Sequence, residues 1–141
     1  MFRVLVAVDG SKSSDRAVAQ LLKKLPWYRE KVDIHLLNVQ SAVPGNASHV
    51  VSTERLEAYH REQGEAALAS ARAILDGASV DYATHIGVGD PASVIARHAG
   101  EKAVDQIVMG ARGLGGVAGM LMGSVTTKVL GLTEIPVLLI R

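Results

Sequence analysis

The amino-acid sequence predicts an α/β fold: a single doubly wound open sheet of five parallel strands, with helices on both faces. Two observations predict it. Five short segments of strand-like composition alternate with stretches of helical periodicity. The first and last strand segments are almost continuous apolar runs, which is typical of parallel strands that helices cover on both sides. Parallel strands need crossover connections, which are right-handed, and this favours a doubly wound sheet. For five strands of this class the usual order is 3-2-1-4-5, which is inferred from the class and not from particular residues.

The predicted strands are short and rich in aliphatic residues, and each is separated from the next by a helical stretch. They cover residues 3–8, 32–40, 80–86, 104–109 and 136–140. The runs Val-Leu-Val-Ala-Val in the first and Val-Leu-Leu-Ile in the last have no polar side that could face water. We therefore expect both to be buried in the sheet.

The first two helices are predicted from a start signal followed by apolar residues at helical spacing. Residues 15–25 follow Ser13 or Ser14 as a possible N-cap, and the helix should stop before Pro26. Ser52 can cap a long helix that ends at Gly77.

The last two helices follow the third and fourth strands. Asp90 places a capping carboxylate ahead of Pro91 at the first helical position. Ser124 opens a helix that reaches Gly131. Residues 41–51 contain proline, glycine and asparagine without periodicity, so we expect a surface loop there.

Composition excludes several classes of function. The 141 residues carry 15 Lys and Arg against 14 Asp and Glu, a net charge of +1, so no strong field steers the chain towards nucleic acid or an acidic membrane. There is no cysteine, which excludes a disulfide framework and thiolate chemistry. No apolar run reaches the ~20 residues of a membrane span. We expect a soluble, unprocessed cytoplasmic protein with one domain over residues 1–141.

Two segments whose residues could bind a ligand follow the first and fourth strands. Asp9 comes directly after the first, and the stretch from Gly110 to Ser124 comes after the fourth. In the order 3-2-1-4-5 these two strand ends meet at the point where ligands bind. Glycines let backbone N–H groups approach an anion closely, and a helix start adds unpaired donors. Phosphate is therefore the expected ligand. The glycines could instead serve only a tight turn and helix packing, although six in fourteen residues exceed that need.

Three other motifs do not fit this stretch. No glycine is followed by Lys and then Ser or Thr, so a Walker A loop is absent. The dinucleotide pattern Gly113-x-Gly115-x-x-Ala118 follows the fourth strand instead of the first, and its acidic partner would have to be Glu134 just before the last strand. No serine lies in the G-x-S-x-G pattern of serine hydrolases.

The spacing that fits is Gly110-x-x-Gly113, nine residues, then Gly123-Ser124. In it the chain resembles the universal stress protein family, whose nucleotide-binding members carry G-x-x-G, nine residues, G-[ST]. The resemblance extends over the whole chain, through residues 6–11, 87–91, 107–113 and 135–140.

The resemblance implies an ATP site, with which Mg²⁺ can be associated. Ala7, Val8 and Asp9 would line the adenine and ribose, Val39 would meet the adenine, Met109, Gly110 and Gly113 would pass beneath the ribose and phosphates, and Gly123, Ser124 and Val125 would hold the phosphate tail. Arg112 could neutralise charge or simply be exposed. The function implied is regulation by nucleotide state, through a protein partner and a stress that the sequence does not identify. It also leaves open whether the ligand is ATP, ADP or another adenine nucleotide.

Two further functions remain open. The chain could hydrolyse ATP slowly or phosphorylate itself, but Asp9 is the one acid expected near the site, so no catalytic residue is assigned and turnover should be slow or absent. It could also be an interaction module of the same fold with no nucleotide. The last strand is apolar and expected at a sheet edge, which predicts a homodimer built around it, and universal stress proteins commonly pair in this way.

The histidines and aromatic residues carry no chemical motif. No pair of the five histidines has metal-ligand spacing, so we expect ordinary surface or half-buried side chains. Trp27 and Tyr28 are expected to form a packed corner and not a platform for bases.

Overall fold

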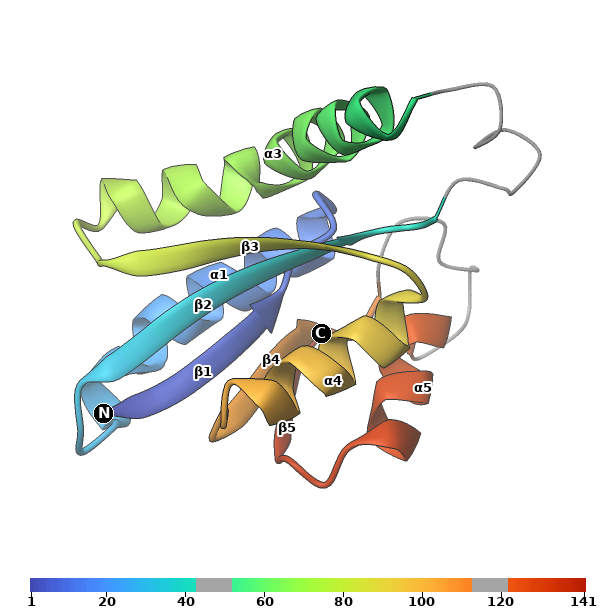
Figure 1. The fold of residues 1–141 in the computed structure, drawn as a ribbon. Coiled ribbons are helices and arrows are strands. Elements are labelled where there is room, and N and C mark those ends of the chain that lie inside the picture. Colours follow the sequence, from blue (N-terminus) through green and yellow to red (C-terminus); the bar gives the residue numbers. More distant parts are fainter. Residues whose placement is uncertain (43–51, 113–121) are drawn as a thin grey trace.

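The computed structural model describes residues 1–42, 52–112 and 122–141. Its strands form one five-stranded sheet in the order β3-β2-β1-β4-β5, and all four neighbouring pairs are parallel (Figure 1). They are β1 (Phe2–Ala7), β2 (Val32–Gln40), β3 (Tyr82–Val88), β4 (Gln106–Gly110) and β5 (Val137–Ile140). The predicted fold class and strand order are confirmed.

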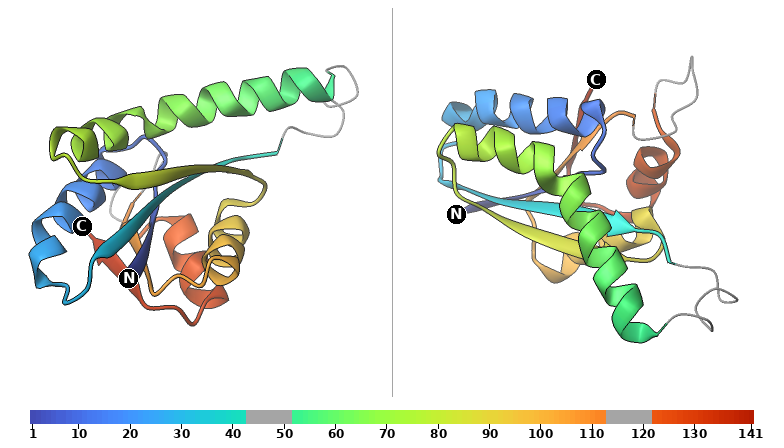
Figure 2. Two further views of the ribbon diagram at one scale, coloured as in Figure 1. Left: turned by 60° about the vertical axis from the view of Figure 1, so that its left-hand side comes forward. Right: turned by 90° about the horizontal axis from the view of Figure 1, so that it is seen from above.

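Helices cover both faces of the sheet, as predicted. They are α1 (Lys12–Lys24), α3 (Thr53–Gly77), α4 (Pro91–Glu101) and α5 (Ser124–Leu132), with a short 3-10 turn η1 (Leu25–Trp27) after α1. Helices α1 and α3 lie on one face and α4 and α5 on the other (Figures 1 and 2). None of the helices in the described ranges is long and apolar enough to cross a membrane.

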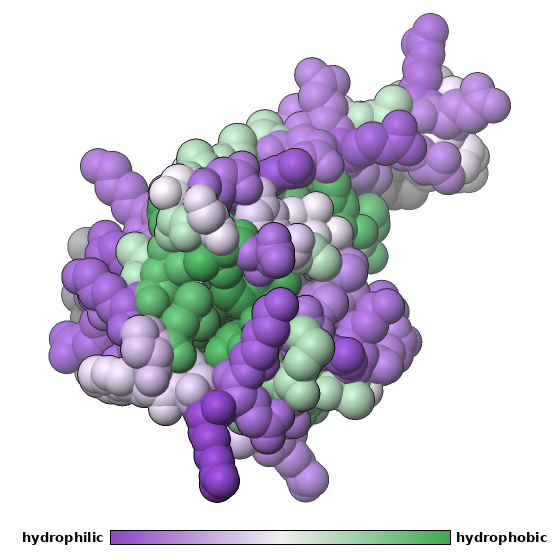
Figure 3. All heavy atoms as spheres, turned by 90° about the vertical axis from the view of Figure 1, so that its left-hand side faces the viewer, coloured by the Kyte–Doolittle hydropathy of each residue, from purple (hydrophilic) through white to green (hydrophobic). Residues whose placement is uncertain are grey.

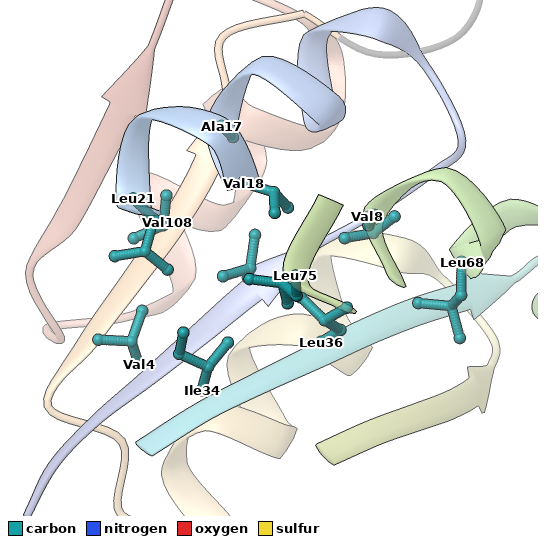
Figure 4. Packing of buried hydrophobic residues seen from close by; sticks show 12 residues of the cluster. Val4, Val8, Ala17, Val18, Leu21, Ile34, Leu36, Leu68, Leu75 and Val108 are labelled. Atoms are coloured by element: carbon teal, nitrogen blue, oxygen red, sulfur yellow. The ribbon is translucent and has the colours of Figure 1, made fainter. Parts of the chain in front are cut away.

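Two hydrophobic clusters hold these layers together, because successive strand residues point to opposite faces. Val4, Val6, Ile34 and Leu36 belong to the cluster under α1 and α3, which Figure 4 shows. Leu5, Leu37, Ile107 and Met109 belong to the cluster under α4 and α5. Fully burying one such side chain stabilises the fold by about 1.5–3 kcal/mol. The two clusters therefore hold the strands, and the residues at their ends, in place.

Strands β3 and β4 begin two residues later than predicted. The backbone N–H of Val80 bonds to Leu75 O at 3.1 Å, and that of Val104 bonds to Ala99 O at 3.0 Å. Both valines therefore close the preceding helix before the chain joins the sheet. Their apolar character is that of a buried helix end and not of a strand.

The start of α1 is also a correction. Its N-cap is Ser11, whose hydroxyl accepts from Ser14 N at 3.2 Å, whereas Ser13 and Ser14 lie inside the first turn and are buried. The prediction placed the N-cap at Ser13 or Ser14, directly before the apolar residues of the helix. It missed that the first turn, which contains both serines, also packs on the sheet. The caps Ser52 and Asp90 are confirmed, since each accepts a hydrogen bond from the N–H three residues on.

The predicted corner after α1 is half right. The Tyr28 ring lies 5.1 Å from that of Phe2, and its hydroxyl donates to Gln106 Oε1 at 2.6 Å. Trp27, in contrast, is 78% exposed and touches Lys24, whose Nζ lies 4.4 Å from the ring centroid. Only Tyr28 is packed.

Candidate functional site

The carboxyl ends of the strands are where polar side chains enter the core. The buried polar residues of the described ranges are Ser13, Ser14, Asn38 and Thr126. They come from the first turn of α1, the end of β2 and the first turn of α5, all at this edge of the sheet. Because buried polar groups need partners, this edge is built by specific hydrogen bonds and not by apolar packing alone.

Asp9 lies in a tight turn between β1 and α1. Its Oδ1 accepts from Ser11 N at 2.9 Å, and Gly10 has a φ of +83°, which favours glycine. A Cβ on Gly10 would lie 3.3 Å from Ala67 Cα, because α3 crosses close over the turn. The position of Asp9 is thus set by α1 on one side and α3 on the other.

Asn38 holds the strand end that presents Asp9. Its Nδ2 donates to Val8 O at 2.8 Å, and its Oδ1 accepts from Gln40 Nε2 at 2.6 Å. Sequence reasoning missed both residues. The signal was Asn38, a polar residue that directly follows the apolar pair Leu36 and Leu37 near the end of the strand.

Gly110 ends β4 against the first turn of α1. A Cβ at this position would lie 2.7 Å from the Ser13 carbonyl oxygen and closer still to Ser13 Oγ. The same Oγ accepts from Arg112 N at 3.3 Å, while the Arg112 residue is exposed. For Gly110, close packing of β4 on α1 is therefore a sufficient reason for glycine.

The start of α5 is tied to the end of β4. Gly123 N donates to Ala111 O at 2.6 Å, and Thr126 Oγ1 donates to Gly110 O at 3.2 Å. Gly123 is the N-cap of α5, and no side chain of the described residues caps the helix. The N–H groups of the first turn and the positive end of the helix dipole together favour an anion at this point.

An apolar strip lies beside this helix start. Ala7, Val39 and Val125 are partly buried and pack against the cluster that contains Met109, all on the α4 and α5 face. Val8 belongs to the opposite cluster and is 2% exposed. A ligand could meet Val8 only through its backbone, where the N–H already donates to Leu37 O.

Helix α4 joins the same edge through Asp90. The carboxylate accepts from Ser93 N at 3.1 Å and from Lys128 Nζ of α5 at 2.9 Å. The hydrogen bond with Lys128, followed by those with Ser93, lowers the pKa of Asp90 to about 2. The ion pair between α4 and α5 was not predicted.

The structure thus brings most of the sequence-predicted residues to one edge. Ala7, Asp9, Val39, Met109 and Gly110 come from strand ends, and Gly123, Ser124 and Val125 from the start of α5. Gly113 lies outside the described residues. No group of three His, Cys, Asp or Glu side chains within residues 1–42, 52–112 and 122–141 is arranged to hold a metal ion.

A separate hollow of about 560 Å³ lies at the opposite, amino-terminal end of the strands. Met1, Leu25, Val32, Val80 and Tyr82 are among its lining residues. Figure 3 shows the molecule from this side, with hydrophobic residues in the middle framed by hydrophilic ones. It shares none of the residues of the carboxyl edge, so we do not assign it to the same site.

Known proteins resemble this chain along its whole length. The model of the universal stress protein family matches residues 1–141. A universal stress protein of Thermus aquaticus is 36% identical over 143 residues and covers 100% of both chains. Universal stress protein YxiE of Bacillus subtilis is 32% identical over 152 residues, covering 99% of this chain and 98% of its own.

Solved structures with bound nucleotides share the fold. A universal stress protein family protein from Arabidopsis thaliana with AMP bound has a TM-score of 0.70 at 25% identity, covering 99% of this chain and 91% of its own. A universal stress protein in complex with cAMP has a TM-score of 0.67 at 25% identity, covering 99% and 96%. The family model that matches residues 1–141 and the relatives at 36% and 32% identity show that the chain belongs to the universal stress protein family.

Proposed function

We propose that this chain is an ATP-binding regulatory protein of the cytoplasm whose nucleotide state alters its interactions during stress. Residues 1–141 would act as one nucleotide-binding domain. The observation that carries the proposal is the start of α5, which no described side chain caps and which is clamped to the end of β4 at the same edge as Asp9. A phosphate group satisfies such a helix start.

The proposed binding mode divides the edge into two parts. Asp9 accepts hydrogen bonds from base or sugar, and the apolar surface of Ala7 and Val39 meets the adenine. The phosphates lie against Gly110, Gly113 and the first turn of α5, with Gly123, Ser124 and Val125 around their tail. Arg112, which is exposed, adds positive charge at the rim.

The structural relatives support an adenine nucleotide as the ligand. The two related structures described above hold AMP and cAMP. We favour ATP for this chain because the stretch from Gly110 to Ser124 offers glycines and a helix start well beyond what a monophosphate needs.

A slow ATPase or a self-phosphorylating enzyme is the alternative of a different class. Phosphoryl transfer needs groups that hold Mg²⁺ and orient the nucleophile. Asp90 lies at this edge but is engaged by Lys128, and Asp9 would be occupied by the ribose. We expect any transfer, to water or to Ser124, to run well below the ~1 per second typical of enzymes.

A homodimer through β5 is the second part of the proposal. Among the strands of the described residues, β5 pairs with β4 alone and so forms one edge of the sheet. Its four residues, Val137 to Ile140, are all only partly buried. An apolar edge of this kind attracts another strand, and a second copy of the chain is the partner we propose, beside a regulatory protein of unknown identity.

The remaining alternative is an interaction module of this fold that binds no nucleotide. The packing of Gly110 against Ser13 favours a structural role for that one glycine. Substitution of Gly123 distinguishes nucleotide binding from a purely structural motif. The backbone of this N-cap, with φ −71°, can be adopted by residues other than glycine.

The test is calorimetric titration of ATP with Mg²⁺ into Gly123→Val. A branched side chain at the helix start should block the phosphate tail and abolish measurable affinity. Gly131→Val is the matched control, because it makes the same change in the same helix, where a Cβ meets nothing within 4 Å. Unchanged affinity in Gly123→Val, with both variants folded, would refute the proposal.

A further inference from the structure

Three histidine rings meet on the face of the sheet that α4 covers. They are His35 from β2, His85 from β3 and His98 from α4. The His35 and His85 rings lie 5.1 Å apart and are nearly parallel, at 14°, and the His85 and His98 rings lie 4.8 Å apart. We call these three residues the histidine cluster. Their spacing in the sequence gave no hint of it, since only the sheet brings them together.

The cluster is anchored at one end by Asp33. Its Oδ2 accepts from His35 Nε2 at 3.0 Å and from Arg3 Nε at 3.1 Å. Because Nε2 of His35 carries that proton, Nδ1 of the neutral ring is an acceptor. His85 Nε2, 2.9 Å away, is then the donor. In this arrangement a proton added to His85 can enter only at Nδ1, because its Nε2 already donates to His35.

The other end of the cluster has no such anchor. His98 Nε2 is buried and has no hydrogen-bond partner among the described residues. As an uncharged acceptor it can be tolerated next to the His85 ring. Once protonated it would be a buried donor with a charge and without an acceptor, which is strongly unfavourable.

The surroundings disfavour a further positive charge. The charged groups that act on the cluster are Arg3 from β1, Asp33 from β2, and Arg97, Glu101 and Lys102 from α4 and its end. Burial, followed by the neighbouring histidines and Lys102, lowers the pKa of His85. Burial, followed by Lys102 and His35, lowers the pKa of His98. The dipole at the end of α4 favours a cation, but these effects outweigh it.

The cluster lies at the end of α4 that is fastened to the sheet. The Arg3 guanidinium, besides holding Asp33, donates to the carbonyl oxygen of Lys102 just after α4. His98 belongs to the last turn of the same helix. A positive charge on His98 would therefore weaken the packing of the last turn of α4 on the sheet.

We propose that the histidine cluster is an acid-sensitive latch, which holds the carboxyl-terminal end of α4 on the sheet while His85 and His98 are uncharged and releases it when these two rings take up protons. The stability it gives is fully present above pH ~6.5, the value of a free histidine. It falls as the pH drops below that value, because the unfolded chain then binds protons that the folded chain rejects. The folding constant falls by up to about tenfold per pH unit for each such histidine.

Asp33 acts in a different range of pH. Its pKa is lowered, mainly by the hydrogen bond with His35. The stability that it contributes is present above its unfolded value, near 3.8, and is lost only below that. The two effects can therefore be separated by titration.

The first measurement uses the unmodified protein. Nuclear magnetic resonance titration of the five histidines should show His85 and His98 taking up protons below pH ~6.5, and hydrogen exchange in residues 94–103, corrected for intrinsic rates, should become faster at pH 5.5 than at pH 7.5. Titration of both rings at ordinary values, or unchanged protection of α4, would overturn the proposal.

The second measurement compares His98→Gln with the wild-type protein. Urea unfolding between pH 7.5 and 5.5 should show a shallower loss of stability in His98→Gln, by up to about tenfold in the folding constant per pH unit. Equal pH dependence in wild type and His98→Gln contradicts the latch.

Discussion

At the scale of single residues, the glycines of the carboxyl edge have different physical roles. Gly10 has a left-handed backbone and lies under α3, and Gly110 lets β4 approach the backbone of Ser13. Gly123 has an ordinary φ of −71° and is the N-cap of α5. One motif therefore combines glycines that shape the edge with a glycine proposed to leave room for a ligand.

Gly110→Ala should destabilise the fold whether or not nucleotide is bound. The added Cβ would lie within 2.8 Å of the Ser13 carbonyl group, and overpacking of this kind costs about 1–3 kcal/mol. Urea unfolding measures the loss. Gly100→Ala is the control, since a Cβ there meets nothing within 4 Å and stability should stay equal or rise slightly. If both variants have the stability of the wild type, the packing role of Gly110 is wrong.

Sequence reasoning found residues of this edge only where a pattern marks them. Asp9 and the glycines are fixed by spacing and by their place after strands, so their arrival at one edge could be predicted. Asn38 and Ser13 act through contacts with Val8 and Gly110, which are 30 and 97 residues away in the sequence. No local pattern reports such contacts. The same holds for His35, His85 and His98, which only the pairing of β2 with β3 and the packing of α4 bring together.

At the scale of elements, the boundaries that could be predicted are those with a side-chain signal. Ser52 and Asp90 cap α3 and α4 as expected, because each stands alone before a helix. Three serines near the start of α1 compete, and burial of Ser13 and Ser14 decides in favour of Ser11. Val80 and Val104 have the composition of strands, but their backbones bond to the preceding helices.

The link between α4 and α5 gives a pH-dependent prediction. The pKa of Asp90 is lowered to about 2 from 3.8, so the stability from this carboxylate is present above pH ~4 and is lost as the pH falls towards ~2. Asp90→Asn keeps a capping side chain but removes the ion pair with Lys128. It should be less stable at neutral pH and lose less stability between pH 4 and 2.

Urea unfolding at pH 7 and pH 3, in low and high salt, checks this prediction. The pair is exposed to solvent, so the difference at pH 7 should shrink as salt screens it. Lys128→Gln, which removes the other partner, should show a similar loss at pH 7. Identical acid dependence of wild type and Asp90→Asn would show that the carboxylate does not stabilise the folded chain.

At the scale of the whole molecule, alternation of strands and helices was sufficient to predict a doubly wound parallel sheet. Right-handed crossovers are shared by several doubly wound orders, so the order 3-2-1-4-5 was inferred from what is usual in this class, and the structure has it. It also places the ends of β1 and β4 side by side, so the location of the proposed site follows from topology. The arrangement of the groups at that location does not follow from topology. It depends on the hydrogen bond between Gly123 and Ala111 and on the hydrogen bonds from α1 and α4.

The most direct measurement of the proposed site is a native mass spectrum of the protein with ATP and Mg²⁺, recorded for wild type and for Gly123→Val. Wild type should appear at twice the chain mass of 14.9 kDa, with one nucleotide bound per chain. Gly123→Val should keep the dimer mass and carry no nucleotide. Equal occupancy of the two proteins, or an absence of bound nucleotide in both, would contradict a phosphate site at the start of α5.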